Sequence, residues 1–207
     1  MLRRPGTSGR AGLSRAAVVA AAAAIADDRG MEAVTLANLA DDLGVRTPSL
    51  YNHIAGLADL LQELAIYSLR DLAARIREAT AETADASGLF AFARAYRAYA
   101  LDHPGLYAAI ARGAGPADEP VLAAASRELV DLALRVLPES VRSEEDRLHA
   151  VRGLRSLVHG FVSIEAIGGF GLALDTDESF SRAVETFAAG LRTIHGTTTT
   201  GGDGDTS

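Results

Sequence analysis

Residues 36–54 read LANLADDLGVRTPSLYNHI, and this stretch decides the fold of the amino-terminal part of the chain. Two short helical segments meet across Gly44, a residue type that readily takes the left-handed backbone conformation of a tight turn. Ala40 is small where the two helices would cross. The apolar residues expected to hold the pair together are Leu39, Leu43, Val45 and Leu50. The stretch therefore predicts a helix-turn-helix.

Polar side chains gather on the second of these two helices. A recognition helix presents such groups to base edges and phosphates at its amino-terminal end. We therefore expect DNA contacts from Arg46, Thr47, Ser49, Tyr51, Asn52 and His53. The alternative is an ordinary helical hairpin that touches no DNA, which explains an apolar Leu50 but not the polar cluster.

Capping residues predict where the helices of this region begin and end. Ser14 is suited to cap a first helix that stops before Gly30, and Thr35 is suited to cap a second. Thr47 is suited to cap the third, which should end near His53.

Apolar periodicity continues through the rest of the chain and predicts an all-α fold. Alanine is abundant, and strand-like runs of β-branched residues are missing. We expect a three-helix head over residues 14–56 and a helical effector-binding and dimerisation domain over residues 57–195. The expected helices of that domain cover residues 57–84, 88–102, 106–112, 119–137, 143–167 and 175–195. The first of them would connect the head to the body.

Charge is distributed unevenly along the chain. Up to residue 60, six arginines balance six acidic residues, whereas the remaining 14 arginines and 21 acidic residues account for the whole net charge of −7. Residues 1–13 are rich in Gly, Arg and Ser, and we expect them to form a disordered basic arm that faces DNA phosphates. Residues 196–207, rich in Gly and Thr, should form a disordered tail.

Several chemistries are excluded by composition and spacing. The chain has no cysteine, and its five histidines lack the spacing of a metal site. The glycines at residues 168–171 do not follow a strand, as they would in a dinucleotide-binding loop, and no nucleophile elbow occurs. We therefore expect no metal, no cofactor and no enzymatic activity.

The amino terminus resembles a secretory signal in one respect, because arginines precede an alanine-rich run over residues 16–26. The run consists of alanine rather than leucine, and a DNA-binding pattern follows it at once. It is also too short to span a bilayer. We expect a cytoplasmic protein without a membrane span.

Aromatic residues concentrate in the body. Buried tyrosine hydroxyls need partners, and aromatic walls with a few polar ends are typical of a small-molecule pocket. The residues expected to line an effector pocket are Phe92, Tyr96, Tyr99, Tyr107, His159 and Phe161. An ordinary core explains this set equally well, and a hydrogen-bonded core histidine is the simpler interpretation of His159.

The last expected helix carries an apolar seam with the 4, 3, 4, 3 spacing of a coiled coil. The seam residues are Phe180, Val184, Phe187, Leu191 and Ile194. The preceding helix is apolar nearly all round and must be covered on more than one side. Two such helices per chain would form the four-helix interface of a homodimer, and the alternative is packing within one chain.

The head resembles the DNA-binding domain of TetR-type transcriptional repressors over residues 14–65. The similarity rests on Thr35-Leu36 and on the run Leu50-Tyr51-Asn52-His53-Ile54 ahead of a long amphipathic helix. In the body, the run HPGLY at residues 103–107 resembles a motif frequent in that family. Val158-His159-Gly160 and residues 168–174 resemble the carboxy-terminal domain of the subgroup named for Trp-His-Gly.

This resemblance implies a dimer that binds a palindromic operator in double-stranded DNA and releases it when a small molecule of unknown identity enters the body. It adds Thr35 to the residues expected at the DNA. The chain departs from the family pattern at Leu57, where a lysine usually grips a phosphate; helix amides or the arginine arm would have to substitute. The alternative function is a helical small-molecule binder or enzyme whose head is only a docking corner.

The arm can be tested by deletion. Removing residues 2–13 should weaken binding to every DNA sequence and flatten the dependence of log K on log salt by up to about one unit per lost phosphate contact. Removing residues 196–207, which contain no arginine, serves as the control and should leave the slope unchanged. A slope that survives loss of the arm would show that the arm makes no phosphate contact.

Overall fold

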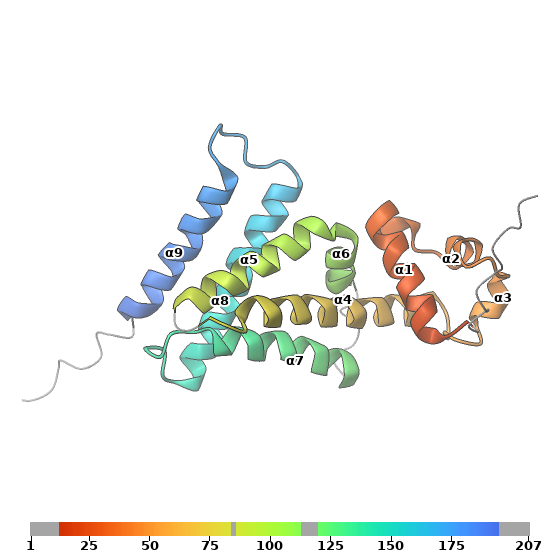
Figure 1. The fold of residues 1–207 in the computed structure, drawn as a ribbon, viewed down its shortest axis with the longest axis horizontal. Helices are drawn as coiled ribbons and strands as arrows, with labels where there is room; N and C mark the ends of the chain where they lie inside the picture. Colours follow the sequence, from red (N-terminus) through yellow and green to blue (C-terminus); the bar gives the residue numbers. More distant parts are fainter. Residues whose placement is uncertain (1–12, 84–85, 113–119, 195–207) are drawn as a thin grey trace, which may run out of the picture.

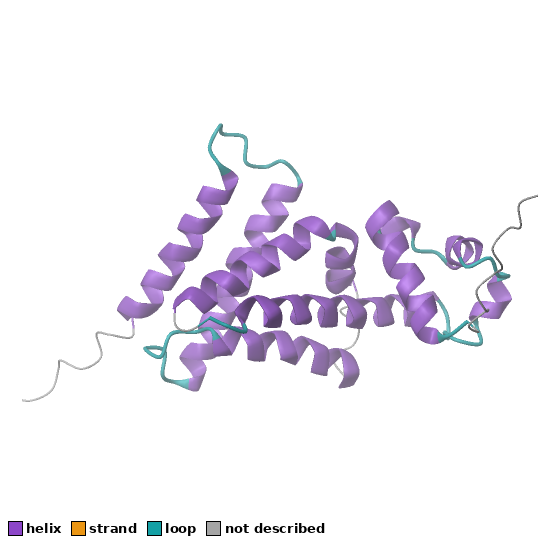
Figure 2. Ribbon diagram, in the orientation of Figure 1, coloured by secondary structure: helices purple, strands orange, loops and turns teal. Residues whose placement is uncertain are grey.

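The computed structural model describes residues 13–83, 86–112 and 120–194, and the regular structure in these ranges is helical throughout (Figure 2). The elements are α1 (Arg15–Arg29), the 3-10 turn η1 (Met31–Ala33), α2 (Leu36–Asp42), α3 (Thr47–Leu50), α4 (Leu57–Thr80), α5 (Ala86–Asp102), α6 (Pro104–Arg112), α7 (Pro120–Arg135), α8 (Glu144–Ala166) and α9 (Thr176–Ile194). The all-α prediction is confirmed. The predicted basic arm, apart from Leu13, and the predicted tail lie outside the described residues.

The head consists of α1, α2 and α3 and lies at one end of the molecule (Figure 1). The Ser14 hydroxyl accepts a hydrogen bond from the Ala17 amide at 3.2 Å and so caps α1 as expected. Gly30 ends that helix with a φ of 81°, and the Thr35 hydroxyl caps α2 through the Asn38 amide at 3.1 Å. Local signals therefore set the boundaries of the head helices.

Helix α4 joins the head to the body and runs along the long axis of the molecule (Figure 1). Leu60 and Leu64 near its start and Leu72 and Ile76 further along are all fully buried. The helix ends at Thr80 rather than near residue 84. There the Thr83 hydroxyl donates to the Thr80 carbonyl at 3.0 Å, which satisfies a terminal acceptor without another turn.

Helix α6 packs its amino terminus directly against the end of α1. A Cβ added to Gly105 would lie 1.8 Å from the carbonyl oxygen of Ala26, so only glycine permits this approach. The Asp27 carboxylate accepts a hydrogen bond from the Leu106 amide at 3.2 Å and lies 2.6 Å from Nδ1 of His103. The head and body therefore touch through α6 as well as through α4.

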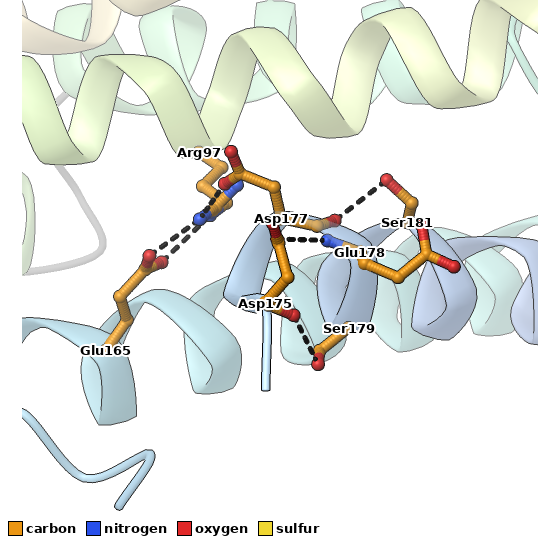
Figure 3. Close-up of polar contacts among 7 residues, drawn as sticks. All are labelled: Arg97, Glu165, Asp175, Asp177, Glu178, Ser179 and Ser181. Atoms are coloured by element: carbon orange, nitrogen blue, oxygen red, sulfur yellow. Dashed lines mark hydrogen bonds and ion pairs between the residues drawn. The ribbon is translucent and has the colours of Figure 1, made fainter. Parts of the chain in front are cut away.

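A partly buried arginine ties three helices of the body together (Figure 3). Arg97 of α5 donates to both carboxylate oxygens of Glu165 in α8, at 2.8 and 2.6 Å. One of its terminal nitrogens also lies 2.7 Å from Oδ1 of Asp177 in α9. The guanidinium stands 5.0 Å from the ring centroid of Phe180 and 5.7 Å from that of Phe161. Ion pairs and cation–π contacts thus fix the ends of α8 and α9 against α5.

The Arg97 charge is held firmly in place. The hydrogen bonds with Glu165 raise the pKa of the guanidinium above its ordinary value, although burial acts in the opposite direction. The first turn of α9 is capped beside this cluster, where Oδ1 of Asp175 accepts from the Glu178 amide at 2.9 Å (Figure 3). The cluster therefore sets the direction in which α9 leaves the turn after α8.

The apolar seam of α9 packs inside the chain. Phe180, Val184 and Leu191 are at most 7% exposed, and Phe187 is half-buried. We expected these residues at an interface between protomers; α5 and α8 of the same chain cover Phe180, Val184 and Leu191, which agrees with the alternative of packing within one chain, and the interface itself stays a prediction. The side chain of Ile194 lies outside the described residues.

Replacing Arg97 with Gln should destabilise the body. The change leaves Glu165, whose side chain is 19% exposed, without its counter-charge, and we expect a loss of about 1–3 kcal/mol in the free energy of unfolding by urea denaturation. Arg182→Gln is the control, because Arg182 pairs with Glu178 on the exposed surface of α9, and its midpoint should match the parent. If both variants unfold at the same urea concentration, the pairing of Arg97 with Glu165 adds no net stability, because water solvates the unpaired carboxylate equally well.

Candidate nucleic-acid interface and ligand pocket

The helix-turn-helix closes around a short turn between α2 and α3. Gly44 has a φ of 65°, and the Val45 amide donates to the Ala40 carbonyl at 2.9 Å. Leu39 and Leu50 are fully buried between the helices. Leu43 and Val45, also expected in this contact, are partly buried and pack against the same core.

Helix α3 is shorter than expected and is tightly wound. It ends at Leu50 instead of continuing to His53, and Arg46 rather than Thr47 holds the capping position. The amides of Ser49 and His53 donate three residues back, to the carbonyls of Arg46 and Leu50, both at 2.8 Å. The residues after Leu50 therefore lie in turns that continue the direction of the helix.

The predicted DNA-contacting residues occupy one continuous stretch of surface, apart from Thr35. Arg46, Tyr51 and Asn52 are exposed, with 57% of Tyr51 accessible. Thr47, Ser49 and His53 are half-buried. Thr35 is half-buried at the start of α2, where its hydroxyl oxygen accepts the capping bond and its hydroxyl hydrogen remains available to a phosphate.

An ion-pair cluster that sequence analysis missed braces this surface from behind. Arg15 at the start of α1 lies 2.7 Å from Oδ1 of Asp59 and 2.8 Å from Oε1 of Glu63, and it donates to the His53 carbonyl at 2.9 Å. Asp59 also accepts from the Ala55 amide at 2.7 Å. One arginine thus joins α1, the end of the recognition turn and α4.

The charge of Asp59 is stabilised within this cluster. Partial burial acts to raise the pKa of its carboxyl, but the hydrogen bonds from Arg15 and the Ala55 amide outweigh it and hold the pKa below the ordinary value. The contribution of Asp59 to stability is therefore present at neutral pH and is lost as the pH falls through that lowered pKa.

Leu57 opens α4 at the place where the resemblance leads us to expect a lysine. Its side chain is 39% exposed and follows Gly56, whose φ of 153° turns the chain into the helix. An apolar side chain at this point supplies no charge to a phosphate. The cations expected at the DNA are therefore Arg46 and the arginines of residues 1–13.

A cavity of about 150 Å³ lies in the body between α4, α5, α6, α7 and α8. Its walls are mostly aliphatic and include Leu69, Ile110, Leu122, Leu129, Val130 and Leu154. Sequence analysis missed the α7 side, although Leu122, Ser126, Leu129 and Ala133 follow the spacing of one helix face. Arg155 of α8 also reaches the cavity and was not anticipated.

The six aromatic and histidine residues predicted for the pocket separate into four groups. Phe92 and Tyr96 line the cavity. Tyr99, three residues further along α5, is fully buried and donates its hydroxyl to the Ser68 carbonyl at 3.2 Å, away from the cavity lining. Phe161 stacks between Phe170 and Phe180 beside Arg97, with centroid distances of 4.6 and 5.0 Å.

Tyr107 and His159 connect Tyr96 to the surface of α8. The rings of Tyr96 and Tyr107 are T-shaped at 5.9 Å, and the Tyr107 hydroxyl lies 2.5 Å from Nδ1 of His159. Burial raises the pKa of both tyrosine hydroxyls. His159 is exposed and is not a core residue. Tyr96, Tyr107 and His159 therefore form a row of polar side chains that runs from the cavity to the surface.

A helix-turn-helix head joined to a helical body with an internal cavity defines a DNA-binding regulator. Residues 18–64 match the domain of bacterial regulatory proteins of the tetR family, and residues 89–187 match the tetracyclin repressor-like C-terminal domain. YobS of Bacillus subtilis, an uncharacterized HTH-type transcriptional regulator, is 39% identical over 89% of this chain and 95% of its own length. The chain belongs to the TetR family of transcriptional regulators; it binds DNA and is not an enzyme.

Solved structures extend this likeness over both parts of the chain. A protein of unknown function from Rhodococcus sp. RHA1 has 25% identity and a TM-score of 0.76, covering 88% of this chain and 97% of that one. BioQ of Mycobacterium smegmatis has 27% identity and a TM-score of 0.64, covering 89% and 99%. BioQ with its double-stranded DNA operator has 26% identity and a TM-score of 0.63, covering 88% and 99%. The Trp-His-Gly subgroup stays a prediction.

The described residues contain neither a candidate membrane span nor a candidate metal site. None of their helices is both long and apolar enough to cross a membrane. No group of three or more histidine or acidic side chains in those residues is placed to hold a metal ion.

Tyr51→Ala tests the recognition surface. With more than half of the ring exposed, the change should leave stability unaltered, while operator affinity falls by about 1–3 kcal/mol if the ring contacts DNA. Fluorescence anisotropy with labelled operator measures this directly. The matched control is Tyr67→Ala, which removes a tyrosine that is 40% exposed on α4 outside the helix-turn-helix. If Tyr51→Ala binds the operator as tightly as the unsubstituted protein does, Tyr51 does not contact the DNA.

Proposed function

We propose that this regulator is a repressor whose operator is released when a small molecule occupies the cavity of the body. The observation that carries the proposal is that two helices lining the cavity also contact the head. Leu69 of α4 and Ile110 of α6 line the cavity. The same α4 packs beneath the head through Leu60 and Leu64, and α6 contacts α1 through Asp27.

In the DNA complex, α3 and the turns after it enter the major groove. The contacts come from Thr35, Arg46, Thr47, Ser49, Tyr51, Asn52 and His53. The heads of a dimer read two half-sites about one helical turn apart, ~34–36 Å, so the operator is palindromic. Because affinity depends on that separation, a small tilt of each head is enough to lower it.

The ligand acts through a short path. A molecule beside Ile110 pushes on α6, and α6 cannot slide past α1 because their backbones touch at Gly105. Asp27 holds the two helices together through the Leu106 amide and His103. Movement of α6 is thereby transmitted to α1 and to the head that α1 supports.

The dimer forms through the outward faces of α8 and α9 and the turn between them. Apolar side chains in this region remain exposed on the single chain, with 82% of Ile167, 78% of Leu172 and 72% of Leu174 accessible. Surfaces of this kind are commonly covered by a partner. The working place of such a dimer is the cytoplasm, where its DNA lies.

Titrations with and without operator test the mechanism. A fragment from upstream of the protein's own coding region serves as DNA, and a metabolite library screened by thermal shift supplies the ligand. The ligand should weaken DNA binding and operator should weaken ligand binding by the same factor, because coupling between two sites is reciprocal. Equal ligand affinity in both titrations would separate the cavity from the control of DNA binding.

Gly105→Ala tests the path between cavity and head. The new methyl group meets the Ala26 backbone, so α6 and α1 must separate, and we expect a loss of about 1–3 kcal/mol in unfolding free energy together with weaker operator binding. Gly190→Ala is the control, since an added Cβ there meets nothing within 4 Å. A Gly105 variant with parent stability and parent DNA affinity would show that α6 moves independently of the head.

A further inference from the structure

The cavity has an aliphatic wall with one charged group at its edge. Among the described residues that line it, Arg155 is the sole charged side chain, and Tyr96 and Ser126 contribute hydroxyl groups. A dry apolar cavity of about 150 Å³ is large enough to hold benzene. The enclosed part of an occupant is therefore apolar and contains roughly six to eight carbon atoms.

Arg155 has no counter-charge among the residues that the structure describes. Its side chain is exposed at the cavity edge, and it forms no ion pair or hydrogen bond with any residue in the described ranges. Arg15 and Arg97, in contrast, are each held by two carboxylates. A planar guanidinium left free at the edge of an apolar cavity matches a carboxylate in shape and in charge.

Tyrosine hydroxyls lie near this charge, and no described acidic side chain lines the cavity. Tyr96 lines the cavity, and Tyr107 stacks against it with a centroid distance of 5.9 Å. Burial raises the pKa of both hydroxyls, while the nearby positive charge of Arg155 lowers it in part, so the guanidinium and the two hydroxyls share one electrostatic environment. His159, one helical turn beyond Arg155, adds a further polar group through its contact with Tyr107.

From this arrangement we infer that the cavity binds an apolar monocarboxylate, with its hydrocarbon body among Leu69, Ile110 and Leu129 and its carboxylate paired with Arg155. A neutral molecule of the same shape would leave the guanidinium unpaired, and a cation would be repelled by it. The inference rests on the proposed function, because it names the chemical class of the molecule that would release the DNA.

Calorimetry with the full chain tests the inference with octanoate, hexanoate and 1-octanol as probes. Octanoate should bind about tenfold more tightly than 1-octanol, because the alcohol has the same body but no charge for Arg155. Octanoate should also bind more tightly than hexanoate by about fourfold for each additional buried methylene. Failure of octanoate to bind, or equal affinity for octanoate and 1-octanol, would overturn the inference.

Single substitutions distinguish the contribution of the Arg155 charge to binding from that of the cavity walls. Arg155→Gln should weaken octanoate about tenfold and leave 1-octanol unchanged, whereas Arg152→Gln, on the exposed side of the same helix, should change neither. Leu129→Trp should fill the cavity and abolish binding of both probes, with folding checked by circular dichroism. Unchanged octanoate affinity in the Arg155 variant would exclude this residue as the carboxylate partner and overturn the inference.

A DNA-binding measurement distinguishes failure of this inference from failure of the proposed function. If octanoate binds through Arg155 and operator affinity stays the same, the cavity is a carboxylate site and the proposed release mechanism is wrong. If octanoate does not bind and another molecule from the library releases the operator, the release mechanism holds and the carboxylate inference is overturned.

Discussion

Direct backbone contact between α6 and α1 is the constraint on which the arrangement of head and body depends. If α4 were the sole connection, the head could rotate about the axis of α4 relative to the body. The contact at Gly105, reinforced by Asp27, adds a second point of attachment and removes that freedom. Because α6 also borders the cavity, an element that fixes the head is one that an occupant would contact.

Arginine serves three different purposes in this chain, which has no lysine. Arg15 braces the head and Arg97 binds the carboxyl-terminal helices to α5, and carboxylates satisfy both charges. Arg155 lies exposed at the edge of a mostly apolar cavity, with tyrosine hydroxyls nearby. The difference lies in the surroundings: a paired guanidinium stabilises the fold, and an unpaired one beside a cavity is available to a ligand.

Sequence analysis succeeded where a signal is local and failed where it depends on distant packing. Ser14, Gly30 and Gly44 mark helix ends because caps and positive φ angles are properties of a few consecutive residues. Apolar periodicity shows that a face is buried but not what buries it, so the α9 seam could not be assigned to packing within one chain or between two. Tyr96 and Tyr99 are only three residues apart on α5, yet Tyr96 lines the cavity and Tyr99 packs against α4, a difference that depends on which helices pack around α5.

The turn between α8 and α9 exposes apolar side chains. If a second chain covers them, the stability of the protein depends on its concentration through mass action. In the proposed dimer, Ile167, Leu172 and Leu174 are covered only when two chains meet, so part of the free energy that stabilises this dimer is gained on association rather than on folding. Thermal stability then rises with protein concentration. At low protein concentration, some chains remain monomeric and less stable. The concentration of the regulator thereby determines how long its chains survive, as well as the occupancy of its operator.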